Sequence, residues 1–253
     1  MKRSLKTLIG YSIEGSDGPK GKVKDFLFDE ERWVIRYMEA DFGSMFNKKR
    51  VLIPRTFMGE PDGQNEKFPV SMSGKDIENC PDLTEELVVS RAYEMELNKH
   101  YGIDNYWMYD FSTMGNTMLY PPRPLRIPSR IITEDDLETS LRSFEEVKGY
   151  HIKAVDDTMG HIEDIIIDDE DWQIVYAIAD TKNWLPWSKK VMLPLDFLND
   201  ISYIKQEVSI DLMKDTIKDA PEYDSSKPVE IKEEREMYEF LTRIMLTNNK
   251  KKR

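Results

Sequence analysis

The chain has 253 residues, enough for one large domain or two ordinary ones with a substantial buried core. Hydrophobic residues make up 40% and charged residues 33%, which is charge-rich but not the composition of a disordered chain. Asp and Glu number 48 against 36 Lys and Arg, so the net charge is −12. An acidic chain repels nucleic-acid phosphates, and direct nucleic-acid binding is not expected.

The cysteine content and the hydropathy pattern favour a cytoplasmic protein. Cys80 is the single cysteine, so the chain cannot form an intramolecular disulfide. The basic residues 1–3 are not followed by the apolar segment of a signal peptide. The longest apolar run, residues 174–179, is far shorter than the ~20 residues that span a bilayer.

A sequence repeat organises the chain. Residues 10–41 align with residues 149–180 without a gap at a shift of 139, and 13 of these 32 positions are identical. The shared residues include the pairs Gly21/Gly160, Trp33/Trp172, Ile35/Ile174 and Tyr37/Tyr176. One inserted residue then aligns Pro54 with Pro194 and Phe57 with Phe197. We therefore expect two copies of one module, with the paired residues at equivalent sites.

Each copy has the pattern of an antiparallel β structure. Residues 21–29 and 160–168 are apolar runs of strand length, each followed by an acidic turn and a second run over 33–41 or 172–180. This order predicts a β-hairpin in each copy. Shorter strands are expected at 51–54, 68–72, 191–194 and 207–210, and helical turns at 75–80 and 212–220 before a proline. Gly18 and Gly21 suit a turn between strands, and Asp157, which replaces Gly18, is expected to adopt its left-handed backbone.

The insert between the copies has a different composition. Residues 84–100 are predicted to form a helix that ends at Gly102. Prolines within residues 121–128 favour a stiff extended connection, and residues 133–136 resemble a capping motif. After the second copy, residues 231–245 predict a helix with Met237, Leu241, Ile244 and Met245 on one face. We expect this helix to dock on the same body or on a second copy of the chain, forming a homodimer.

Aromatic side chains gather in the insert and are the strongest candidate for a functional surface. They are Tyr101, Tyr106, Trp107, Tyr109 and Phe111. One interpretation is an interdomain core that packs against the repeats, because aromatic residues dominate buried contacts. The other is a surface that binds a partner or ligand. Arg123, Arg126 and Arg130 form a sparse basic patch without interleaved aromatics, which does not favour nucleic-acid binding.

The residues do not predict a catalytic, cofactor or metal site. The acidic turns at 29–31 and 168–171 lack the alternating ligand spacing of a calcium loop. His100, His151 and His161 are not spaced as zinc ligands, and Cys80 has no cysteine partner. No dinucleotide, P-loop, nucleophile-elbow or zinc-protease motif occurs, so we expect no enzymatic activity and no cofactor.

The repeated pattern resembles the PRC-barrel family, named after the cytoplasmic domain of the photosynthetic reaction-centre H subunit. The resemblance is carried by Gly10-Tyr11, Gly21 through Asp25 and Trp33 in the first copy, and more closely by residues 143–194 in the second. It implies an all-β fold with tandem barrels over residues 4–83 and 142–223. Residues 84–141 are then the connecting insert, similar to that of prokaryotic tandem proteins, and residues 224–253 a helix with a basic tail.

For function, the resemblance implies a scaffold or adaptor that assembles proteins, in some relatives at a membrane complex. A ribosome-maturation factor also carries such a barrel, so an assembly factor that binds a basic protein is the first alternative. An enzyme with a site between the barrels is the second. The resemblance does not identify the partner.

Overall fold

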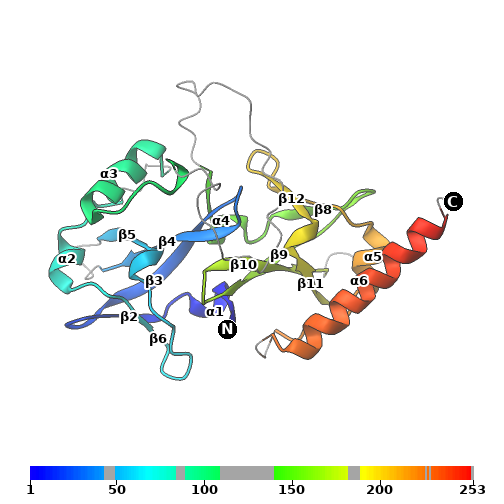
Figure 1. Cartoon of the computed structure of the whole chain (residues 1–253), viewed down its shortest axis with the longest axis horizontal. Coiled ribbons are helices and arrows are strands. Elements are labelled where there is room, and N and C mark those ends of the chain that lie inside the picture. The colour runs from blue at the N-terminus through cyan, green and yellow to red at the C-terminus, as the bar shows by residue number, and fades with distance from the viewer. Residues whose placement is uncertain are drawn as a thin grey trace.

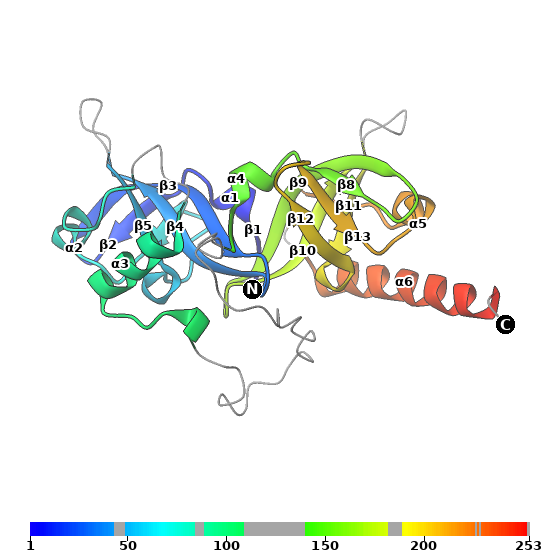
Figure 2. The same ribbon diagram turned by 90° about the horizontal axis from the view of Figure 1, so that it is seen from above.

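The computed structural model describes residues 1–42, 49–83, 89–108, 140–181, 189–225, 227 and 229–251. Two β-rich lobes lie side by side, with the N-terminus between them and a long helix on the outer side of the second lobe (Figures 1 and 2). The predicted features at residues 84–88, 121–128 and 133–136 fall outside the described residues, as do Tyr109, Phe111 and Arg130.

The two lobes contain nearly the same elements in the same order. The first half contains β1 (Lys2–Ser4), α1 (Leu5–Leu8), β2 (Ser12–Gly15), β3 (Gly18–Asp29), β4 (Val34–Asp41), β5 (Arg50–Pro54), η1 (Arg55–Phe57), β6 (Lys67–Pro69) and α2 (Gly74–Glu78). The second contains β7 (Leu141–Ser143), α4 (Phe144–Val147), β8 (His151–Lys153), β9 (Thr158–Asp168), β10 (Gln173–Asp180), β11 (Lys190–Pro194), η5 (Leu195–Phe197), β12 (Leu198–Ser202), β13 (Glu207–Ile210) and α5 (Lys214–Asp219). The second half has one strand more, β12.

The predicted hairpins are confirmed, but the strands do not form two separate sheets. β3 pairs with β4, and β9 pairs with β10, both antiparallel. Strands from both lobes belong to one 13-stranded mixed sheet, which continues from one lobe to the other through β10 and β4. The order of this sheet runs from β12 to β6 without closing on itself. The structure is thus strand-rich, as predicted, with the two lobes joined through their backbones.

Trp33 and Trp172 occupy equivalent sites, as the repeat predicts. Both are buried and both have a left-handed backbone, with φ of 55° and 61°. The carbonyl of Trp172 accepts a hydrogen bond from the backbone N–H of Ile35, and the carbonyl of Trp33 accepts one from Ile174. The two tight turns therefore meet at an approximate two-fold axis between the lobes. Asp157 is absent from the residues with positive φ, so the prediction that it mimics Gly18 is wrong.

Gly21 lies within a strand, so the prediction that it belongs to a turn is wrong. Gly160, its partner in the repeat, also lies within a strand, as predicted for residues 160–168. Gly21 is in β3 and Gly160 is in β9, each beside a register shift in the pairing with the preceding strand, β2 or β8. A Cβ at either position would collide with the backbone carbonyl of the next strand, that of Asp41 or Asp180. The pair is therefore equivalent in packing, because both glycines allow a close approach of two strands. Their backbones differ, however, with φ of 138° at Gly21 and 47° at Gly160, and only Gly160 is buried.

The beginning of each half crosses to the opposite lobe. We call residues 2–8, which form β1 and α1, the first arm, and residues 141–147, which form β7 and α4, the second arm. β1 pairs with β9 and β7 pairs with β3, both antiparallel. α1 packs on β9 and α4 packs on β3, so each arm completes the lobe to which it does not belong in sequence.

The same polar contacts hold both arms. Ser4 donates a hydrogen bond to Asp164, and the backbone N–H of Lys6 donates a second one to that carboxylate. In the other lobe, Ser143 and the N–H of Glu145 donate to Asp25 in the same way. Each serine also caps the short helix of its own arm, because its hydroxyl accepts from the N–H three residues later.

A helix packs on the outer face of each lobe, and the two helices are also equivalent. The helices are α3 (Arg91–Tyr101) and α6 (Ile231–Lys251). Tyr37 donates a hydrogen bond to Glu94 of α3, and Tyr176 donates one to Glu234 of α6. Each glutamate lies 57 or 58 residues after its tyrosine. The helix therefore follows the strands in each half as part of the same pattern.

The predicted bounds of both helices need correction. α3 begins at Arg91 instead of residue 84, because the Ser90 hydroxyl caps the helix by accepting from the N–H of Tyr93. It ends at Gly102 in the left-handed conformation, as predicted. α6 runs to Lys251, and its C-terminal end projects away from the strands (Figures 1 and 2). Met237 and Leu241 are buried on the second lobe, while Ile244 is half-buried.

No helix among the described residues is both long enough and apolar enough to cross a membrane.

Candidate functional site

Tyr101, the first residue of the predicted aromatic cluster, packs on the first lobe at the end of α3. Its ring lies 5.3 Å from that of Phe57, and its hydroxyl hydrogen-bonds the carbonyl of Leu52 and the thiol of Cys80. Burial raises the pKa of the Cys80 thiol. A buried thiol with a raised pKa is a poor nucleophile. These contacts therefore identify Cys80 as a packed side chain and not as a reactive one.

Tyr106 and Trp107 lie in η2 (Tyr106–Met108) and cover two arginines. The Arg36 guanidinium is 3.7 Å from the centroid of the Tyr106 ring, and that of Arg91 is 4.2 Å from the Trp107 ring. Arg32 donates a hydrogen bond to the carbonyl of Tyr106. Both aromatic side chains are half-buried, so this short segment is held on the first lobe by cation–π and backbone contacts.

Glu94 joins these residues in a buried polar network. Its side chain is 0% exposed and accepts hydrogen bonds from Tyr37 and Tyr106, while Arg91 forms an ion pair with it. Burial, followed by the charge of Glu94, raises the pKa of Tyr106 well above its ordinary value. The network holds η2 against α3 and β4. The structure thus brings together Tyr106 and Trp107, whereas Tyr101 lies at the C-terminal end of α3 with Cys80.

The carboxylates of the acidic turns are engaged by cations and N–H groups of the chain. Asp29 pairs with Arg36 at 2.8 Å and also accepts from the N–H groups of Glu31 and Arg32. Asp169 in the second turn pairs with Arg3 of the first arm. These contacts explain why adjacent acidic residues are tolerated in a turn, and they leave fewer carboxylate oxygens for an external cation.

Sequence reasoning missed one group with the residue types of a metal site. His161, Glu163 and Asp180 place one ligand atom each within 4.8 Å of one another. The signal was available, since His161 and Glu163 are two residues apart on a strand and Asp180 is the cross-strand partner of His161. However, Lys6 and Lys190 already form ion pairs with Glu163. Burial alone would raise the pKa of Glu163, but the two lysines outweigh this effect, and the pKa lies below its usual range. Two ammonium groups are thus already paired with the carboxylate that a cation would use.

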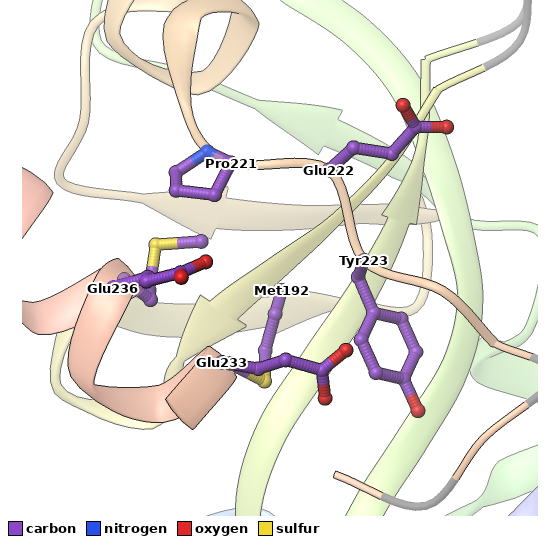
Figure 3. A pocket seen from close by; sticks show the side chains of 7 residues that line it. Met192, Pro221, Glu222, Tyr223, Glu233 and Glu236 are labelled. Carbon is purple, nitrogen blue, oxygen red and sulfur yellow. The ribbon is translucent and has the colours of Figure 1, made fainter. Parts of the chain in front are cut away.

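A small pocket lies between α6 and the second lobe (Figure 3). Met192 of β11 forms its floor, Tyr223 one wall, and Glu233 and Glu236 of α6 its rim. It has room for about one water molecule. Such a volume is far below that of a site for an organic substrate.

The surfaces of the two lobes differ in exposed apolar residues. Tyr203 and Ile204 form the tip of the β12–β13 hairpin and are 60% and 94% exposed. The equivalent tip in the first lobe carries Gly63 and Gln64. The turns have the same geometry, because Glu66 and Gln206 at their ends both have φ near +51°. The difference is therefore chemical.

A second pair of exposed apolar residues in the second lobe also has small polar counterparts in the first lobe. Val155 and Met213 are exposed and adjacent, since the N–H of Val155 donates to the carbonyl of Leu212. The first lobe has Ser16 and Ser73 at these positions. The second lobe thus presents four large apolar side chains where the first lobe presents small or polar ones.

The family comparison agrees with the resemblance in the second half of the chain. Residues 143–217 match the model of the PRC-barrel domain. This stretch begins in the second arm and ends in α5, so it includes β8 to β13. The curated proteins contain no match to the chain.

Proposed function

We propose that this chain is a non-enzymatic scaffold with two PRC-type modules in tandem, the second of which binds a partner protein. The PRC-barrel match covers the second module. The first is proposed as a module of the same type because its elements, its tryptophan turn and its tyrosine–glutamate contact repeat those of the second.

The exposed hairpin tip of the second lobe is the observation that supports binding of a protein. An isoleucine that is 94% exposed next to a half-exposed tyrosine contributes nothing to the core of this chain. Aromatic and aliphatic anchors of this kind supply most of the binding energy at protein interfaces. The same turn in the first lobe shows that the fold does not need apolar residues there.

The scaffold interpretation is preferred to an enzyme on chemical grounds. In the part of the chain that the structure describes, buried carboxylates contact other elements of the fold: Asp25 and Asp164 hold the arms, Glu94 joins α3 to η2, and Asp29 and Glu39 pair with Arg36 and Arg50. The pocket beside α6 is too small for a substrate.

Charge supports a second candidate, an assembly factor that binds a basic protein such as a ribosomal one. The net charge of −12 favours a basic partner through long-range attraction. The two candidates share the proposed surface and differ only in the partner.

The test is affinity capture of partners from a lysate of the source cells at low salt. The bait is the intact chain, and its variant carries the first-lobe residues at the second tip, Tyr203→Gly with Ile204→Gln. A matched control replaces Gln64 by Asn in the first tip. Proteins retained by the wild type and by the control but lost with the double variant support the proposal. Equal capture by all three baits contradicts it.

A further inference from the structure

The two arm contacts are equivalent in position but opposite in charge. Lys6 of the first arm forms an ion pair with Glu163 of β9. One repeat shift away, the corresponding residues are Glu145 in the second arm and Lys24 in β3. Lys24 is exposed, and Glu145 pairs with Lys148, which directly follows the second arm. Each arm thus faces a lobe that carries the complementary charge at this position.

Other contacts of the arms do not distinguish the lobes. Both arms use a serine that donates to a buried aspartate, Asp164 or Asp25. Both also use an arginine that pairs with an acidic turn, since Arg3 binds Asp169 and Arg142 binds Glu30. These shared contacts provide binding, but either arm would make them on either lobe. Discrimination has to come from the positions that differ.

Pairing of like lobes would reverse the favourable charges. Two first lobes would bring Lys6 beside Lys24, and two second lobes would bring Glu145 beside Glu163. The apolar anchors also differ, because Leu5 of α1 and Phe144 of α4 are both fully buried. Exchanging them would overfill one lobe and leave a cavity in the other. Repulsion and misfit against the wrong partner are how specific interfaces reject it.

We propose that the two arms form a recognition surface that selects pairing of a first lobe with a second lobe. We further propose that this surface can bind a second copy of this chain. In such a dimer, the first lobe of one protomer pairs with the second lobe of the other. Every contact described between the lobes is then preserved, which makes exchange of this kind low in cost. Residues 109–139 span on the order of 100 Å when extended, so the connection does not forbid it. This inference is independent of the proposed scaffold function.

The test uses cysteine cross-links at the junction of the two lobes. Val34 of β4 and Gln173 of β10 are direct antiparallel partners. The full chain first receives Cys80→Ala, which places at this position the alanine that the second lobe has as Ala220. Val34→Cys and Gln173→Cys are then made on separate chains, which are refolded together at high concentration and oxidised. Chains refolded separately and mixed afterwards are the control.

Disulfides between a Val34→Cys chain and a Gln173→Cys chain are the expected product, and they should depend on refolding together. Dimers with two Val34→Cys chains or two Gln173→Cys chains report pairing of like lobes. Predominance of such dimers, or the absence of any dimer, overturns the proposal.

The charge code is tested in the same assay. Lys6→Glu with Glu145→Lys exchanges the charges of the two arms and should lower the yield of unlike dimers several-fold. Adding Lys24→Glu and Glu163→Lys should restore it. Circular dichroism establishes that each variant folds. A yield that does not respond to the exchange, in variants that do fold, shows that these charges do not specify the pairing.

Discussion

Ser4 and Asp164 lie 160 residues apart in the sequence, yet the hydroxyl of one donates a hydrogen bond to the carboxylate of the other. The repeat places Ser143 against Asp25 in the same relation. Two reciprocal contacts of this kind mean that neither lobe is complete without a segment from the opposite half of the chain.

Replacing either serine by alanine should therefore destabilise the whole molecule. Ser4→Ala and Ser143→Ala each remove a hydrogen bond to a buried carboxylate and the cap of a short helix. We expect each to lower the free energy of unfolding by about 1–3 kcal/mol, and the melting temperature by several degrees in a single transition.

The measurement is thermal unfolding followed by circular dichroism. Ser71→Ala is the matched control, because the Ser71 hydroxyl is exposed and makes only a long contact of 3.4 Å. Two separate transitions, with one of them unchanged, would show that the lobes unfold independently.

The arm contacts should also make stability depend on pH. Burial raises the pKa of Asp25 to about 6, despite the hydrogen bonds from Ser143 and Glu145 that oppose this change. In the unfolded chain an aspartate has a pKa near 3.8. The folded state therefore binds more protons between these two values, and stability decreases as pH rises through this window.

Asp25→Asn tests this sign. The asparagine oxygen can still accept from the N–H groups of Phe26 and Glu145, and its amide can donate to Ser143. The stability of the wild type relative to this variant should fall by roughly 1–3 kcal/mol from pH 4 to pH 7. Asp164→Asn should act in the same direction, because burial also raises the pKa of Asp164. Denaturant unfolding at several pH values provides the comparison, and parallel profiles for wild type and variants would contradict the prediction.

The contacts of η2 predict unequal roles for its two aromatic residues. Tyr106→Phe removes a hydrogen bond to the fully buried Glu94 and should cost about 1–2 kcal/mol. Trp107→Ala removes a half-buried ring from Arg91 and should lower the melting temperature of both lobes together. Calorimetry measures both. A melting temperature that stays the same in Trp107→Ala would instead identify the ring as a free surface for a partner.

Folding is predicted to need no metal ion. Lys6 and Lys190 bind the central carboxylate of the group formed by His161, Glu163 and Asp180. The melting temperature should be the same with and without EDTA, and added Zn²⁺ or Ca²⁺ should not raise it. A decrease of many degrees in EDTA would show that a cation stabilises the fold, and His161→Ala would then identify the site.

The repeat predicted the local structure well because it is encoded locally. The alternation of apolar residues and the acidic turns define the hairpins, and the shared tryptophans mark equivalent turns. Burial and φ of Trp33 and Trp172 agree with this prediction. The cap at Gly102 was likewise readable from one residue type at the end of a periodic segment. The prediction of a turn at Gly21 was wrong, because a glycine required by the close approach of a neighbouring strand has the same local pattern as one required by a turn.

The sequence pattern could not predict that each arm crosses to the opposite lobe. Arg3-Ser4 and Arg142-Ser143 obey the same repeat shift, but a three-residue strand has the same pattern whichever lobe it joins. The equivalence of α3 and α6 was obscured because the helices differ in length and few residues other than Glu94 and Glu234 match. The exposed tip at Tyr203 and Ile204 required knowledge of burial, since apolar residues beside a strand usually predict core.

The exchanged arms also determine when the protein can fold during synthesis. The first lobe contains residues up to Tyr101, but residues 141–147 pair with its β3 edge and donate to the carboxylate of Asp25. A ribosome must therefore extend the chain well beyond the first lobe before that lobe can close. Contacts between residues so distant in sequence slow folding and prolong the exposure of apolar surface. Early termination after the first half should accordingly yield an aggregation-prone fragment.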